Sequence, residues 1–415
     1  MKDVVIIGAG AAGLAAAAEV ERAGRSYQLI EAQPWIGGRA RTDRARFGVP
    51  VDLGCHWLHS PAQNPFAAAA ERFGYRVRKG AQSEAYAWNG ERLDAERFVD
   101  ASAYVEACFD RIIAAKAEPD CAVSALFPEP GPWHAMFEEA FLLKQGLPAR
   151  VASAHDFGAY VWEGDDWPVE DGLGDLVART AGDIRAELST PARRIDWRRS
   201  DRVAVQTDRG TIEAHHAIVT VSMGVLQSNL IAFDPALPDW AHSAIDALTM
   251  GNMNKIVVGF SRNVFGDLEH SLSMSCAADR QAVECVIRPG GENIVVGMVG
   301  GPFGKELARA GGAAMADYLV SALSDIFGND VRAALEPQQL LVDWDANPYT
   351  AGCYAVAKPG HADARAALNV PVGDRLHFAG EALHVRYCGD VHGAHFSGID
   401  AARRALQALE PRTAK

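Results

Sequence analysis

The sequence predicts an α/β protein in which one strand–helix unit, assembled from separate stretches of the chain, is interleaved with a second unit of mixed strands and helices. Three observations support this prediction. The chain begins with an apolar run, a glycine-rich turn and an alanine-rich segment, which is the order of strand, turn and helix. Alternating apolar runs follow between residues 194 and 221, and another strand and helix between residues 377 and 409. The stretches between these blocks have a different pattern, with Trp, Phe and Ala at helical spacing.

The first element is the apolar run 3–7 (DVVII), which is typical of a buried parallel strand. It is followed by GAGAAG at residues 8–13, a GxGxxG pattern. The first glycine permits a tight turn, the second lets the backbone approach a pyrophosphate, and the third lets helix and strand pack closely. The binding candidates in this turn are Gly8, Gly10, Ala12 and Gly13.

The next two elements complete the motif. The alanine-rich segment 14–21 favours a helix, whose N-terminus offers unpaired N–H groups to phosphate. A second strand over residues 27–30 ends at Glu31, which lies 23 residues after Gly8 and near the spacing that binds a ribose diol. These elements together predict an adenine dinucleotide site; the alternative is a glycine turn without a ligand.

Composition excludes several classes of protein. The net charge of −13 argues against nucleic acid as a partner, and it either suits a cationic substrate or serves solubility alone. Seven cysteines without a CxxC pair indicate a reducing compartment and no metal site. No apolar run approaches the length of a membrane span, and the first strand begins too early for a signal peptide. We therefore expect a cytoplasmic protein that binds no membrane.

The remaining elements set the expected domain limits. A β-meander over residues 194–221 should return the chain to the first unit, and the last helix should run from about Ser397 to Leu409. Other helices are expected over 98–116 and 313–327, and strands over 256–260 and 295–299. The first unit is expected to comprise residues 1–80, 175–245 and 370–415, and the second unit residues 81–174 and 246–369.

Five segments, in their order along the chain, resemble flavin-containing amine oxidases, the family of polyamine oxidases, monoamine oxidases and the lysine-specific histone demethylase. They are GAGAAG with Glu31, GGR at 37–39, DLGCHWLH at 52–59, VSMGVL at 221–226 with GNMNK at 251–255, and FAGE at 378–381 with VHGA at 391–394. The resemblance covers nearly the whole chain. It implies a discontinuous Rossmann-type FAD-binding domain with an interleaved α+β substrate-binding domain.

The resemblance also assigns residues to FAD. Glu31 would bind the adenosine ribose, Arg39 would face the pyrophosphate, and Glu381 would bind the ribityl–pyrophosphate side. Val391 would meet the pyrimidine edge of the flavin near a helix start, which stabilises negative charge on reduced flavin. The other residues expected beside FAD are Gly38, Gly54, His56, Trp57, Ala192, Trp344 and Gly380.

Two candidate catalytic residues follow from the resemblance. Lys255 matches a lysine that holds a water against flavin N5 and assists reoxidation by oxygen; the alternative is an exposed lysine at a strand edge. His59 matches a histidine near the substrate amine in animal polyamine oxidases, where a group that titrates near neutrality sets amine protonation. The alternative for His59 is a hydrogen-bonded structural histidine.

Cys353 and Tyr354 lie in a stretch that is similar to monoamine oxidases, where the cysteine carries FAD as a thioether. FAD is therefore expected either covalently bound through Cys353 or beside a buried, inert thiol. Tyr354 is expected to form one wall of an aromatic substrate cage, because aromatic faces attract cations; core packing is the alternative.

The opposite wall departs from the family pattern. Asp390 stands where monoamine oxidases and plant polyamine oxidases carry a tyrosine, and Tyr387 better matches the aromatic residue of the histone demethylase. A closed cage of two tyrosines is therefore not expected, and Asp390 would instead pair with a substrate ammonium. The nearby acidic residues would either steer polyamines into the cleft or form a solvated loop; they are Glu163, Asp165, Asp166, Glu170 and Asp171.

The resemblance thus implies an FAD-dependent amine oxidase, which transfers hydride from the carbon of a C–N bond to flavin N5. The imine would hydrolyse to an aldehyde, and O2 would be reduced to H2O2. A polyamine or acetylpolyamine is the first expected substrate and a monoamine the second. Another flavin oxidase or desaturase on the same fold, and a non-catalytic flavin-binding module, are the alternatives. The small cationic amine and O2 are the only expected partners of a monomer or homodimer.

Overall fold

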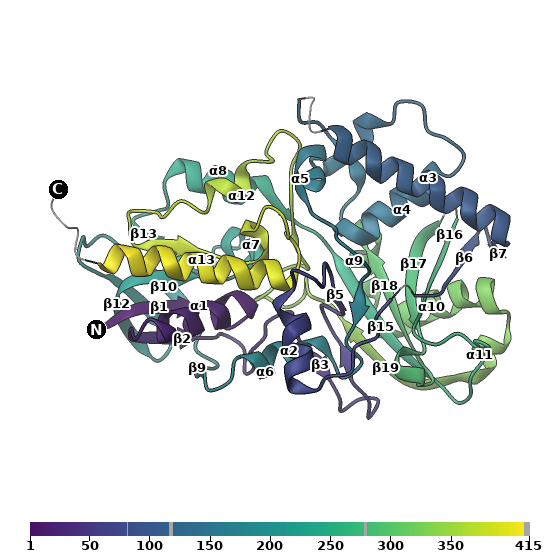
Figure 1. The fold of residues 1–415 in the computed structure, drawn as a ribbon, viewed down its shortest axis with the longest axis horizontal. Helices are drawn as coiled ribbons and strands as arrows, with labels where there is room; N and C mark the ends of the chain where they lie inside the picture. Colours follow the sequence, from purple (N-terminus) through teal and green to yellow (C-terminus); the bar gives the residue numbers. More distant parts are fainter. Residues whose placement is uncertain (81, 116–118, 278–279, 411–415) are drawn as a thin grey trace.

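The computed structural model describes residues 1–80, 82–115, 119–277 and 280–410. Its strands form two large sheets, an eight-stranded sheet on the left of Figure 1 and a seven-stranded sheet on the right. The N-terminus and the last helix that the structure describes both lie beside the eight-stranded sheet, although much of the chain between them lies in the other half. The first sheet is therefore built from segments that are far apart in sequence.

The eight-stranded sheet is parallel at its centre. Strand β1 pairs in parallel with β12 on one side and with β2 on the other, and Val4–Ile6 of β1 are fully buried. The order is β13-β10-β11-β12-β1-β2-β9, with β21 pairing with β12 in parallel. The strands are β1 (Lys2–Ile7), β2 (Tyr27–Ile30), β9 (Ala186–Glu187), β10 (Ala192–Asp196), β11 (Val203–Thr207), β12 (Gly210–Val219), β13 (Ala232–Asp234) and β21 (Leu376–Phe378).

Two long helices from opposite ends of the chain pack together on this sheet, α1 (Ala11–Arg22) and α13 (Val391–Leu409). Gly398 permits their close approach, since a Cβ at this position would lie 2.0 Å from the carbonyl oxygen of Ala12. In the structure this last helix begins at Val391, six residues before the predicted start at Ser397. The sequence obscured this start because Gly393 and Gly398 weaken the helical signal, while close packing requires both glycines.

The seven-stranded sheet has the order β19-β15-β18-β17-β16-β6-β7, and its pairs are antiparallel except for β16 with β6. Its strands are β6 (Glu84–Trp88), β7 (Glu91–Arg92), β15 (Met253–Phe260), β16 (Ser271–Ala277), β17 (Arg280–Ile287), β18 (Ile294–Gly300) and β19 (Leu335–Val342). Helix α10 (Gly312–Phe327) packs on one face, and α4 (His134–Gln145) packs on β16, β17 and β18.

Alternation along β15 assigns its side chains to the two faces of this sheet. Ile256, Val258 and Phe260 pack with α10 in one core cluster, whereas Met253 and Val257 belong to another cluster. Lys255 lies between these last two in the alternation, so it points away from α10 and toward the space between the sheets.

Three small two-stranded ladders and the remaining helices complete the fold. The ladders pair β3 (Thr42–Asp43) with β4 (Val51–Asp52), β5 (Trp57–Leu58) with β8 (Trp167–Pro168), and β14 (Leu248–Met250) with β20 (Ala355–Ala357). The remaining α-helices are α2 (Pro65–Phe73), α3 (Ala95–Ala114), α5 (Ala154–Ala159), α6 (Leu173–Thr180), α7 (Met223–Gln227), α8 (Asp239–Ala247), α9 (Gly301–Ala310), α11 (Asp330–Ala334) and α12 (Ala364–Ala367). The short 3-10 helices are η2 (Val123–Leu126), η3 (Ala149–Val151), η4 (Pro289–Gly291) and η5 (Glu381–Leu383).

Within the described ranges, no helix combines the length and apolar character needed to cross a bilayer. The same residues contain no group of three or more His, Cys, Asp or Glu side chains that could hold a metal ion.

Candidate active site

A cavity of about 1220 Å³ is lined by residues of both large sheets and of the segments between them. This volume exceeds that of a typical site for one drug-sized ligand. Its lining includes the glycine turn after β1, Lys255 of β15, and residues of α3 and α4. A cavity of this extent has room for a dinucleotide and a second small molecule together.

The turn after β1 is open toward the cavity. Gly10 is the N-cap of α1 and gives the helix no side-chain cap, so its first N–H groups are left for a ligand. Gly8, Gly10 and Ala12 line the cavity. Gly13 does not line it, because this glycine packs against the backbone: a Cβ there would lie 1.8 Å from the Gly8 carbonyl oxygen.

Glu31 lies at the end of β2 and lines the same part of the cavity. Its carboxylate accepts hydrogen bonds from the backbone N–H groups of Ala9 at 2.7 Å and Gln33 at 2.8 Å. Burial raises the pKa of Glu31, and these N–H donors oppose that rise by stabilising the charged form. The side chain is therefore held rigidly where a ribose diol would meet it.

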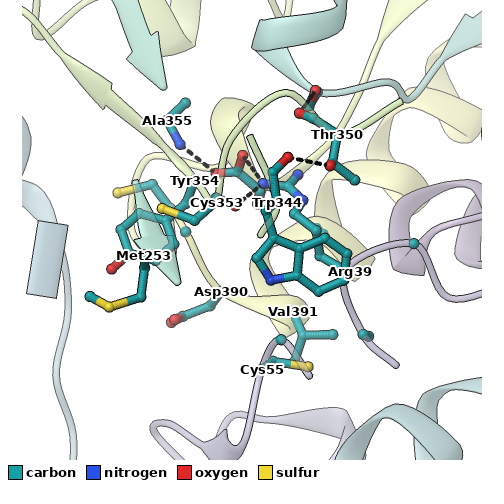
Figure 2. A pocket seen from close by; sticks show the side chains of 18 of the residues that line it. Arg39, Cys55, Met253, Trp344, Thr350, Cys353, Tyr354, Ala355, Asp390 and Val391 are labelled. Atoms are coloured by element: carbon teal, nitrogen blue, oxygen red, sulfur yellow. Dashed lines mark hydrogen bonds and ion pairs between the residues drawn. The ribbon is translucent and has the colours of Figure 1, made fainter. Parts of the chain in front are cut away.

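Arg39 places a cation beside the middle of the cavity. Its guanidinium donates to Glu381 at 3.1 Å and to the backbone carbonyl of Cys353, as the dashed lines in Figure 2 show. The chain passes close behind Arg39 at Gly54, where a Cβ would lie 1.8 Å from the Arg39 carbonyl oxygen. The guanidinium is thus fixed by partners from two distant segments, and Gly54 packs against the Arg39 backbone.

Lys255 is buried, with 6% of its surface exposed. Its ammonium donates to the carbonyl oxygens of Gly54 at 2.6 Å and Asp52 at 3.1 Å. Burial lowers the pKa of Lys255, and the charge of Asp52 partly offsets this effect. The exposed strand-edge alternative is therefore wrong: Lys255 is held inside the cavity lining.

Cys353 and Tyr354 lie on the cavity wall between Arg39 and Asp390, close to Trp344 (Figure 2). Cys353 is 7% exposed, and burial raises the pKa of its thiol. The Tyr354 hydroxyl donates to the Leu143 carbonyl at 3.2 Å, which fixes its ring. Tyr354 thus presents an aromatic surface to the cavity rather than packing in a closed core.

Asp390, which follows Gly389 beside Tyr354, is the centre of a polar cluster in the cavity lining. It accepts a 2.6 Å hydrogen bond from the Tyr160 hydroxyl and lies 3.9 Å from His59 Nε2. The other His59 nitrogen, Nδ1, is 2.7 Å from Asp166. Burial alone would lower the pKa of His59, but Asp390 and Asp166 raise it to about 9. Burial raises the pKa of Asp390 to about 6, against the opposing effect of His59.

Tyr387 does not reach the cavity. It is buried beside His384, with ring centroids 5.1 Å apart, and beside His392 at 4.5 Å. The backbone turns between Tyr387 and Val391, and this turn presents Asp390 instead. Of the predicted cofactor and catalytic residues, all except Gly13 and Tyr387 line the cavity.

The acidic stretch between residues 163 and 171 divides into two parts. Glu163 and Asp166 line the cavity, and Asp166 binds His59. Asp171 instead accepts hydrogen bonds from Arg76 and is a surface ion pair. Neither steering by the whole stretch nor a freely solvated loop describes both parts.

The cavity residues that sequence reasoning missed include Tyr160, Trp162, Lys144 and Glu284. Tyr160 and Trp162 could have been found, because they form an aromatic pair directly before the acidic stretch. Glu284 was recognisable as a single acid within the apolar strand run 282–287. Lys144 lies at the end of α4, and no local pattern distinguishes it from a solvated lysine.

Comparison with known proteins agrees with this geometry. A family model described as flavin-containing amine oxidoreductase matches residues 11–406. Polyamine oxidase 2 of Arabidopsis thaliana is 31% identical to this chain, and the match covers 96% of the chain and 87% of that protein. Polyamine oxidase 3 of Oryza sativa subsp. japonica is 30% identical, with coverage of 98% and 90%.

Among solved structures, wild-type putrescine oxidase bound to putrescine has a TM-score of 0.82 with this chain. The sequences are 19% identical, and the match covers 98% of this chain and 99% of the other. This likeness concerns the fold, which places two sheets around one cavity in the mixed α/β arrangement described above.

Proposed function

This chain belongs to the family of flavin-containing amine oxidoreductases, and from that premise we propose that it is an FAD-dependent oxidase of a polyamine or an acetylpolyamine. The supporting observation is that one cavity contains both an open dinucleotide turn with Glu31 and a half-buried cluster suited to a cationic amine. That cluster consists of Asp390, Tyr160, His59 and Asp166.

The residues of the cavity fit FAD. The uncapped N-terminus of α1 offers N–H groups to a pyrophosphate, and Arg39 adds a fixed cation for the same anion. Glu31 offers carboxylate oxygens to the adenosine ribose. When bound, the flavin supplies the hydride acceptor and the route for electrons to O2, with H2O2 as the product.

The amine site first orients the substrate as an ammonium and then favours the neutral amine, which is the form that reacts. Asp390 and the ring of Tyr354, which both line the cavity, attract the incoming ammonium. The amine must lose its proton before hydride leaves the adjacent carbon, and cationic His59 beside Asp390 disfavours a second positive charge there. Tyr354 and Trp344 exclude water from the reacting carbon.

Lys255 is proposed to hold a water molecule at the reacting face of the cavity. Its ammonium has two carbonyl acceptors, Asp52 and Gly54, and a third N–H that remains for a ligand. Because burial lowers its pKa, Lys255 can also release and regain a proton more easily than a surface lysine.

Two alternatives for Cys353, a covalent bond to the flavin and an unreacted thiol, are distinguished by one experiment. A thioether to the flavin would leave the yellow colour in the pellet after acid precipitation. A buried, inert thiol would leave the colour in the supernatant, and the high pKa that burial gives this thiol favours the second outcome.

The proposal is tested by anaerobic mixing of the purified flavoprotein with spermine, spermidine, N-acetylspermine, putrescine and benzylamine. Bleaching of the visible flavin band by the polyamines supports the proposal. Bleaching by benzylamine alone would favour a monoamine substrate, as the Cys353–Tyr354 stretch suggests. If no amine bleaches the flavin, amine oxidation is refuted, and another flavin oxidase or a non-catalytic module becomes the better account.

A further inference from the structure

The floor of the cavity is one row of side chains across the seven-stranded sheet. Met298 of β18 pairs with Lys255 of β15 on one side and with Glu284 of β17 on the other. Directly opposed residues point to the same face of a sheet, and all three line the cavity. Since neighbouring strands are about 4.8 Å apart, the backbone at Glu284 is roughly 10 Å from that at Lys255.

Helix α4 packs on the same sheet and contributes a further cation, Lys144, to the cavity lining. Lys144, near the C-terminal end of α4, is exposed, and it lines the cavity. Its ammonium lies 3.9 Å from the ring centroid of Trp162 and 5.8 Å from that of Phe109, which both line the cavity as well. The exposed surface of Lys144 therefore faces the cavity. Its ammonium lies on the aromatic face of Trp162 there.

Lys144 and Glu284 attract each other without forming a direct pair. Desolvation of its ammonium within the cavity lowers the pKa of Lys144, while Glu284, Asp166 and Glu84 oppose this fall through their charge. Among the residues that the structure describes, neither Lys144 nor Glu284 forms a side-chain hydrogen bond or an ion pair within 4.0 Å. Both groups thus remain available to a ligand between them, one as a donor and the other as an acceptor.

We propose that Lys144 is a specificity-determining residue, which together with Glu284 selects polyamines whose distal nitrogen is acylated over those with a distal ammonium. This inference rests on the proposed function and names its substrate class.

The selection follows from the chemistry of the two groups. An N-acyl group has a carbonyl that accepts from the Lys144 ammonium and an N–H that donates to the Glu284 carboxylate. A free distal ammonium would pair with Glu284 but would be repelled by Lys144 across the same space. A neutral amide therefore satisfies both protein groups, whereas a cation satisfies one and opposes the other.

The test measures the second-order rate constant of anaerobic flavin reduction with spermine and with N-acetylspermine. The wild-type protein should prefer the acetylated amine. Lys144→Met should lower the ratio of acetylated to free amine by roughly tenfold or more, because it removes the repulsion and the carbonyl donor. Glu284→Gln should change the ratio in the opposite direction, since it removes one of the carboxylates that attract a distal ammonium in this part of the cavity, where Glu84 and Asp166 also act.

Lys79→Met is the matched control. Lys79 also lies over an indole ring, at 5.0 Å from the centroid of Trp167, but it is not part of the cavity lining. This variant should keep the wild-type ratio. A ratio that is unchanged in Lys144→Met, or that changes equally in Lys79→Met, overturns the inference, as does a wild-type preference for spermine. In each of these cases flavin bleaching by amines would still support the proposed oxidase activity, whereas failure of every amine to bleach the flavin would refute that activity itself.

Discussion

Replacing Arg365 by methionine should destabilise the protein strongly, although Arg365 lies outside the cavity lining. The Arg365 side chain is 1% exposed and that of its partner Asp156 is 3% exposed. Arg365 donates to Asp156 at 2.6 and 2.8 Å, and to the carbonyls of Ala355 and Ala382 at 2.7 and 2.8 Å. The guanidinium thus connects α5 with β20, the strand that begins directly after Tyr354.

The expected loss follows from these contacts. Removing one partner of a buried ion pair leaves an uncompensated charge and costs about 3–5 kcal/mol of unfolding free energy. The Asp156 carboxylate would keep one donor, the backbone N–H of Ala357 at 3.0 Å, which limits this part of the loss. Two carbonyls would lose their donors, at about 1 kcal/mol each. We therefore expect a total of about 5 kcal/mol.

Urea unfolding of the flavin-loaded protein, followed by far-ultraviolet circular dichroism, measures this loss. A second variant combines Arg365→Met with Asp156→Asn and removes the uncompensated charge. It should recover part of the lost stability, because the cost lies in the unpaired carboxylate rather than in the missing attraction. A loss below about 1 kcal/mol in the single variant, or a double variant less stable than the single one, would refute the reasoning.

Four other predictions concern the site and the first sheet. Lys255→Met should retain flavin but slow its reduction or reoxidation about a hundredfold or more in stopped-flow measurements, and unchanged rates would exclude Lys255 from the mechanism. In wild type the second-order rate of amine oxidation should rise from about pH 6 to pH 9, since Asp390, with a pKa of about 6, becomes anionic and the amine loses its proton. Asp390→Asn should weaken apparent amine affinity about tenfold, and an equal affinity would remove its role. Burial lowers the pKa of His216 to about 4 and that of His377 to about 3, so each stays neutral in the native state. Unfolding free energy should therefore fall as pH drops from about 6.5 toward 4, by up to about 1.4 kcal/mol per pH unit for each group, and His377→Asn should flatten this slope.

Local patterns predicted the dinucleotide-binding motif at the start of the chain well. The run 3–7, the glycine turn and Glu31 are neighbours along the chain, and short-range geometry determines how a strand, turn and helix connect. The structure has these elements as β1, α1 and β2. The role of Gly13 in close packing also agrees with the 1.8 Å approach of the Gly8 carbonyl.

The start of α13 was harder to predict, because the glycines that obscure it are required by contacts with other segments of the chain. Gly393 and Gly398 lower helix propensity, yet a Cβ at either position would collide with the backbone of Tyr387 or Ala12. Tyr387 itself illustrates the same difficulty: alignment with a family pattern placed it near the substrate, but the turn before α13 directs it into the core.

The sequence by itself determined the family, the dinucleotide turn, and the residue types expected around a flavin and an amine. These features depend on neighbouring residues or on ordered motifs, which the chain displays directly. Only the tertiary structure decided that Tyr160, Lys144 and Glu284 join His59 and Asp390 around one cavity. Their separation along the chain is large, and the register of the seven-stranded sheet together with the packing of α4 on it brings them together. Charge placement inside the cavity is therefore a property of the fold and not of any local pattern.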